Sequence, residues 1–276
     1  MVEQTTKTLS QWAVFLAREP LPVLQDSLVE LAQLRQDGTR LSAQAVAHIV
    51  LRDPMLTAHL LRYLQQHRSR HQQQEIIEVE PALMMLGLET FYGQVVADLG
   101  SAEERLASNP EALDNLKRVL TRLACAADYA REWAVRLNDR HYGEVYVAAL
   151  LHDLAEAVLW IFAPHSLLRV RENQSLNKGL RSHDAQEQVL GFSILALQRE
   201  LVIRWGLPEL LVTLMDDQQA LSSRVRCVTL AINLARHAGN GWDDAALPDD
   251  YLGIARLLRM PLAEVREWLA PAEPQS

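Results

Sequence analysis

The strongest constraint on the fold is an apolar segment, VYVAALLHDLAEAVLWIF, at residues 145–162. We interpret it as a helix, placed at residues 144–162, with the doublet His152-Asp153 in its middle. On such a helix both side chains rise from a mostly small-residue surface that faces the core. A buried carboxylate is costly unless it is paired, hydrogen-bonded or bound to a metal. We therefore expect Asp153 to have a partner.

The rest of the chain is also patterned for helices. Leu and Ala abound, aromatic residues are few, and no series of alternating strands or fixed-period repeat is present. Asp53-Pro54 and Asn109-Pro110 are helix-start signals, because Asp or Asn caps the first N–H groups and Pro fits the first turn. The fold class predicted is all-α. The segments expected to be helical include 11–18, 24–35, 42–52, 54–66, 81–100 (interrupted near Gly87), 111–137, 144–162, 183–205, 208–218, 221–238 and a short pair within 249–269.

A chain of 276 residues fits one large domain or two small ones, and ASNPEALD (107–114) is the best internal boundary. We expect a flexible N-terminus (1–10), an N-terminal helical subdomain (11–108), a second helical subdomain (109–240) and a C-terminal helical extension with its tail (241–276).

Composition limits the classes of function. The formal net charge of −8 argues against general affinity for nucleic acid, which needs a basic face. Cys125 and Cys227 lie far apart in apolar patterns and are expected to be buried thiols, which suits a reducing compartment. No signal pattern is evident, and no apolar run is expected to approach the roughly 18 residues that cross a bilayer. We expect a soluble, cytoplasmic protein without a membrane partner.

The doublet segment resembles the His-Asp helix of the HD superfamily of metal-dependent phosphohydrolases. The wider layout resembles one branch, the HD-related output domain (HDOD) of bacterial signalling proteins, over roughly residues 20 to 218. This resemblance implies a multi-helix bundle of HD type with two helical halves. Four stretches occur in the expected order: LPVLQDSLVEL (21–31), RDPMLTAHLLRYL (52–64), PALMMLGLETF (81–91) and EQVLGFSILALQRELVIRWGLPELL (187–211).

The metal-binding pattern of catalytic HD members is incomplete in this chain. Such members use a His about thirty residues before the doublet, where this chain has Arg122 in a helix that contains no His. A zinc or iron site needs three or four well-set ligands. We therefore predict no catalytic residues, no cofactor and no metal; a metal, if bound, would use His152 and Asp153. Other departures are Ser193 in place of a His, Asp216-Asp217 in place of a His pair, and Ala155-Glu156 in place of Gly-Lys, which leaves Glu156, Asp216 and Asp217 as conceivable oxygen ligands.

These departures suggest a remnant site composed of His152, Asp153, Arg122 and Glu156. We hypothesise that Arg122 replaces the metal as the counter-charge of Asp153, because a guanidinium stays charged when buried and binds a carboxylate bidentately. The resemblance then implies a noncatalytic signalling module that binds another protein. Two alternatives stay open: a divergent metal-dependent phosphohydrolase of a nucleotide or phosphoester, and a module that binds a cyclic dinucleotide or another nucleotide messenger.

A basic segment, RYLQQHRSRHQQQ (62–74), loses its apolar periodicity after about residue 67. Most such segments are solvated loops, but this one is also a candidate docking surface for an acidic partner. The candidate partner-binding residues are Arg62, His67, Arg68, Arg70 and His71.

Overall fold

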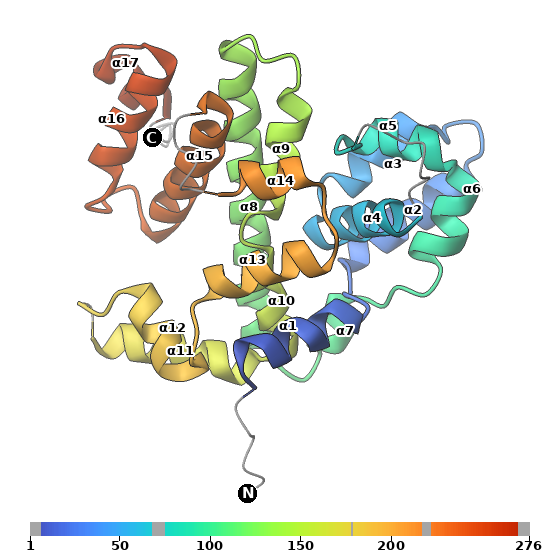
Figure 1. Ribbon diagram of the computed structural model, residues 1–276, viewed down its shortest axis with the longest axis horizontal. Helices are drawn as coiled ribbons and strands as arrows, with labels where there is room; N and C mark the ends of the chain where they lie inside the picture. The colour runs from blue at the N-terminus through green and yellow to red at the C-terminus, as the bar shows by residue number, and fades with distance from the viewer. Residues whose placement is uncertain (1–6, 68–74, 178, 217–221, 270–276) are drawn as a thin grey trace, which may run out of the picture. The chain divides into compact units, whose positions relative to one another are not determined.

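The computed structural model describes residues 7–67, 75–177, 179–216 and 222–269 (Figure 1). Over these residues the regular structure is helical, apart from an isolated β-bridge between Val23 and Ser101. The all-α prediction is confirmed. The first helices are α1 (Leu9–Arg18), α2 (Gln25–Gln36), α3 (Ala43–Val50), α4 (Pro54–Gln66), α5 (Val79–Leu86), α6 (Leu88–Thr90), the π-helix η1 (Phe91–Val96), α7 (Ala102–Arg105) and α8 (Pro110–Arg136). They are followed by α9 (Tyr142–Leu151), α10 (Leu154–Phe162), α11 (Pro164–Leu176), α12 (Ser182–Leu190), α13 (Ile194–Arg204), α14 (Glu209–Leu214), α15 (Ser223–Asn240), α16 (Leu247–Leu258) and α17 (Leu262–Leu269).

The helices group into two compact units. The first unit contains Met1–Leu120 and Asp153–Pro208, and the second contains Thr121–His152 and Glu209–Ser276. The chain thus passes from one unit to the other within α8, at the doublet and after Pro208. The predicted subdomain boundaries after residues 108 and 240 rest on the sequence alone and stay predictions.

Both helix-start signals work as expected. The Asp53 carboxylate accepts hydrogen bonds from the backbone N–H groups of Met55 (3.0 Å) and Leu56 (3.2 Å), and Pro54 begins α4. The Asn109 side chain accepts from the backbone N–H of Ala112 (3.1 Å) at the start of α8. Since each cap satisfies N–H groups that have no partner within the helix, these two positions fix where α4 and α8 begin.

Two of the predicted helices are broken. The segment 183–205 forms α12 and α13, because Gly191 takes a left-handed conformation (φ 80°) and ends α12. The Ser193 hydroxyl then caps α13 by accepting from the backbone N–H of Ala196 (3.2 Å). The segment 144–162 forms α9 and α10, with the doublet between them. The expected interruption near Gly87 is present, where α5 ends and φ is 83°.

In the first unit, α1 packs against α13, and α13 packs against α10. Trp205, which follows α13, is buried and donates its indole N–H to the carbonyl of Leu16 (3.4 Å). This hydrogen bond links the end of α13 to α1.

In the second unit, α15 packs against α9 and α16. Cys227 on α15 is 1% exposed, as expected for a buried thiol, and its burial raises its pKa to about 12. Cys125 on α8 is exposed, so the expectation of two buried thiols was wrong for it. The pattern misled because Cys125 precedes two Ala residues that do face the core.

The expectation about membrane-spanning segments needs a correction. Tyr142–Phe162 is long and apolar enough to cross a membrane by length and composition, although the two helices within it are separated at the doublet. Of its most apolar stretch, 78% is buried inside the protein. Core packing therefore accounts for its apolar character.

Candidate functional site

The doublet lies at a helix break. His152, 4% exposed, caps the end of α9, and Asp153 precedes α10 with φ −106° and ψ 28°, outside the helical region. Asp153 and Glu156 are both half-buried. The expected buried carboxylate in mid-helix is therefore a partly exposed carboxylate at a helix start. Asp153 therefore lies at the N-terminal end of α10, where a helix carries a partial positive charge.

Gln198, a buried residue of α13, forms a hydrogen bond to the first turn of α10, next to the break at the doublet. Asp153 makes no side-chain cap on α10; instead, the Oε1 atom of Gln198 accepts a hydrogen bond from the backbone N–H of Ala155 (2.7 Å). Gln198 is 4% exposed and comes from α13. An acceptor 43 positions away in sequence thus satisfies an N–H that the first turn of α10 cannot. Sequence reasoning missed Gln198, since nothing local to Ala155 identifies it.

The proposed Arg122–Asp153 pair stays a prediction. Arg122 lies half-buried on α8 in the second unit, whereas Asp153 begins the second segment of the first unit. Glu156, in the first turn of α10, also belongs to the first unit.

The ligand-type residues do not fit the metal site of catalytic HD members. Helix α8 contains no His, and among the described residues no cluster of three His, Cys, Asp or Glu ligand atoms includes His152 or Asp153. Ser193 stands where a His is common, and its hydroxyl caps α13. Asp216 is half-buried, and Asp217 lies outside the described residues. We derive no catalytic step through a metal.

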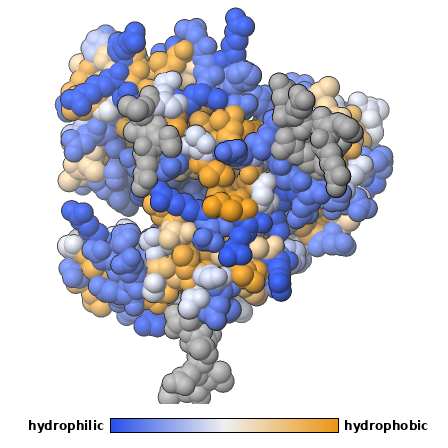
Figure 2. Space-filling view, viewed as in Figure 1, coloured by the Kyte–Doolittle hydropathy of each residue, from blue (hydrophilic) through white to orange (hydrophobic). Residues whose placement is uncertain are grey.

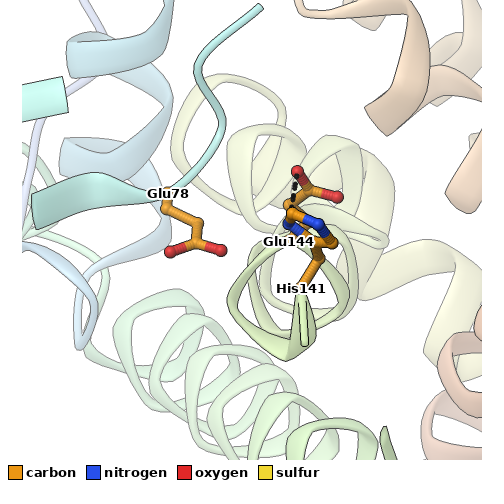
Figure 3. A group of neighbouring side chains, drawn as sticks. All are labelled: Glu78, His141 and Glu144. Carbon is orange, nitrogen blue, oxygen red and sulfur yellow. Dashed lines mark ion pairs between the residues drawn. The ribbon is translucent and has the colours of Figure 1, made fainter. Parts of the chain in front are cut away.

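A charged cluster at the start of α9 was not anticipated from the sequence. The Nδ1 atom of His141 lies 3.8 Å from Oε1 of Glu144 (Figure 3). The Arg224 guanidinium of α15 pairs with Glu144 and with Asp139, its Nε atom 2.9 Å from Oδ2 of Asp139. These contacts tie α15 to the turn before α9 within the second unit. Glu78, also drawn in Figure 3, belongs to the first unit, and we assign no site to the three residues shown.

The candidate partner-binding residues are only partly within the described chain. Arg62 is half-buried, donates to the carbonyl of Ala17 (2.9 Å) and lies 5.2 Å from the ring of Trp205. Burial lowers the pKa of Arg62. Its contacts make it a structural link between α4, α1 and the end of α13. His67 is exposed and stacks on Tyr63, with the ring centroids 4.0 Å apart. Arg68, Arg70 and His71 lie outside the described residues.

Comparison with known protein families identifies the family of the chain. A family model, HDOD domain, matches residues 21–221, most of the chain. The chain belongs to the HDOD family. This confirms the resemblance seen in the four sequence stretches and in the doublet segment. No curated protein matches the chain.

Two solved structures have a fold similar to that of this chain. The MmoQ response regulator of Methylococcus capsulatus str. Bath has a TM-score of 0.71 and 18% identity, over 92% of this chain and 100% of that one. A virulence factor of Campylobacter jejuni has a TM-score of 0.68 and 17% identity, over 95% of this chain and 94% of that one. At such identities these likenesses establish the fold alone.

Proposed function

We propose that this HDOD chain is a noncatalytic regulatory module of signal transduction that acts by binding another protein in the cytoplasm. The observation that carries the proposal is the incomplete set of metal-ligating residue types in the chain. Arg122 stands where the catalytic pattern has a His, and α8 contains no His at all. A cationic guanidinium at that position cannot bind a metal ion, so the ligand set for metal-activated water is missing.

The local structure supports a structural role for the doublet. It separates α9 from α10, and Gln198 holds the first turn of α10. A similar fold is found in MmoQ, which is described as a response regulator, and this supports a signalling role for the present chain.

Two assays test the proposal. With Mn²⁺ present, hydrolysis of a generic phosphodiester is expected to equal the background and to be the same for wild type and Asp153→Asn. Chemical crosslinking and affinity capture from native lysate are expected to yield the same partner protein with wild type and with Asp153→Asn. Mn²⁺-dependent hydrolysis lost in Asp153→Asn would instead indicate a phosphohydrolase. Saturable stabilisation by a cyclic dinucleotide would indicate a messenger-binding module.

A further inference from the structure

Helix α5 exposes two methionines. Its inner face buries Val79, Ala82 and Leu83, whereas Met84 is 70% exposed and Met85 is 47% exposed. Hydrophilic residues cover most of the face seen in Figure 2, with apolar residues confined to patches. Met84 and Met85 are adjacent in sequence and both lie on the solvent-facing side of α5.

Acidic residues flank the two methionines. Glu80 is exposed one turn before Met84, and Glu89 on α6 has 88% of its side chain exposed. Over residues 75–104 the sequence contains seven acidic residues and no Lys or Arg. Among the described residues, the base paired with Glu89 is Arg35 of α2, at 3.5 Å and itself half exposed. Such an exposed pair contributes little and is readily exchanged for another base.

We infer that the outer face of α5 and α6, defined by Glu80, Met84, Met85 and Glu89, is a docking surface for a basic amphipathic helix of a partner protein. This inference rests on the proposed function and names the chemistry of its partner. Methionine suits the role because its unbranched, polarisable side chain adapts to different apolar surfaces. An exposed helix face is most simply covered by another helix. Glu80 and Glu89 favour a partner helix whose apolar face is bordered by Lys or Arg, and they disfavour a partner helix bordered by acidic residues.

The test uses the full chain with ¹³C-methyl methionine and a synthetic Leu/Lys amphipathic peptide of about 16 residues. On titration with the peptide, the methyl signals of Met84 and Met85 are expected to shift, while that of Met55, which is 0% exposed, stays in place. The apparent Kd should weaken at least about threefold when salt rises from about 50 to about 500 mM, because the acid–base contacts are screened. A Leu/Glu peptide of the same pattern should not bind.

The variant Met84→Lys/Met85→Lys should weaken peptide binding by about tenfold or more, since it removes apolar contact and adds like charge. Leu176→Lys on α11, at a residue 81% exposed in the same unit, is the matched control and should bind as wild type. Equal binding by both variants would overturn the inference. So would methyl shifts that follow protein concentration without peptide, because they would show a second copy of the chain on this face.

Failure of this inference is distinguishable from failure of the proposed function. If a crosslinked protein partner is retained by Met84→Lys/Met85→Lys, the module binds elsewhere and only the surface is wrong. If Mn²⁺-dependent hydrolysis appears, the proposed function itself is wrong whatever the peptide does.

Discussion

At the scale of single residues, two polar groups of α4 and its N-cap, Asp53 and His59, are largely removed from solvent and have shifted pKa values. Asp53 is 0% exposed, and burial raises its pKa, while hydrogen bonds from the backbone N–H groups of Leu24 and Leu56 act in the opposite direction. Burial lowers the pKa of His59 to about 4, opposed by its hydrogen bond to the Leu21 carbonyl. A neutral imidazole must donate its Nε2–H in that 2.7 Å contact.

The lowered pKa of His59 predicts that the folded state loses stability in acid. The unfolded state takes up a proton near pH 6.5 and the folded state only near pH 4, so stability is complete above 6.5 and is lost as pH falls between these values. Between pH 7 and pH 5 the loss should reach at most about 2 kcal/mol, an upper limit because part of His59 meets solvent.

Urea unfolding at the two pH values measures this loss. His59→Gln, which keeps a donor for the Leu21 carbonyl, should show a smaller loss between pH 7 and pH 5 than wild type. Identical losses in the two proteins would refute the assignment.

Asp53→Ala should destabilise the protein by about 2–4 kcal/mol, because it removes a helix cap and leaves buried N–H groups without an acceptor. One of these is the N–H of Leu24, 2.7 Å from the Asp53 carboxylate. Asp53→Asn keeps an acceptor oxygen and should cost less. Chemical denaturation compares the two variants, and an Asn variant as unstable as the Ala variant would contradict the capping account.

At the scale of elements, the capped helix starts and the interruption at Gly87 could be predicted, whereas the break at the doublet could not. Asp53-Pro54 and Asn109-Pro110 carry local signals, and both act as caps. No side-chain cap marks the break at His152-Asp153, and the acceptor for the backbone N–H of Ala155 comes from Gln198 on α13. Likewise the Asp53 carboxylate accepts a hydrogen bond from the backbone N–H of Leu24, which lies 29 positions away. Hydrophobic periodicity predicts which face of a helix is apolar, but it cannot predict a hydrogen-bond acceptor that comes from a helix distant in sequence.

The variant Gln198→Met tests whether the hydrogen bond from the Ala155 N–H to Gln198 stabilises the start of α10. The substitution keeps the length of the side chain but removes the acceptor for the buried N–H of Ala155, and should cost about 1–3 kcal/mol. Thermal unfolding together with hydrogen exchange at Ala155 measures it. Exchange at Ala155 as slow as in wild type would show that the N–H has another acceptor.

The Arg122–Asp153 pair predicted from the sequence can be measured by a double-mutant cycle. With Asp153 half-buried, the coupling energy between Arg122→Ala and Asp153→Asn should be about 1–3 kcal/mol, below the 3–5 kcal/mol of breaking a fully buried pair. Arg118→Ala, at an exposed position of α8, should show no coupling to Asp153→Asn. Additive effects of the first two substitutions would remove the idea that Arg122 replaces a metal.

At the scale of the whole molecule, the HDOD assignment ties the helical pattern to a family whose match covers residues 21–221. The four motif stretches predicted this membership because their order, not any one of them, is specific. The chain passes between its two compact units within α8, at the doublet and after Pro208, and no local sequence signal of the kind found at Asn109-Pro110 predicts such an alternation.

The proposed noncatalytic function requires that the doublet holds no catalytic metal. The direct measurement is the content of transition metal per chain in full-length protein purified without chelators, for wild type and for His152→Ala. We expect far less than one ion per chain, with no difference between the two proteins. About one ion per wild-type chain, absent from the His152→Ala variant, would contradict it.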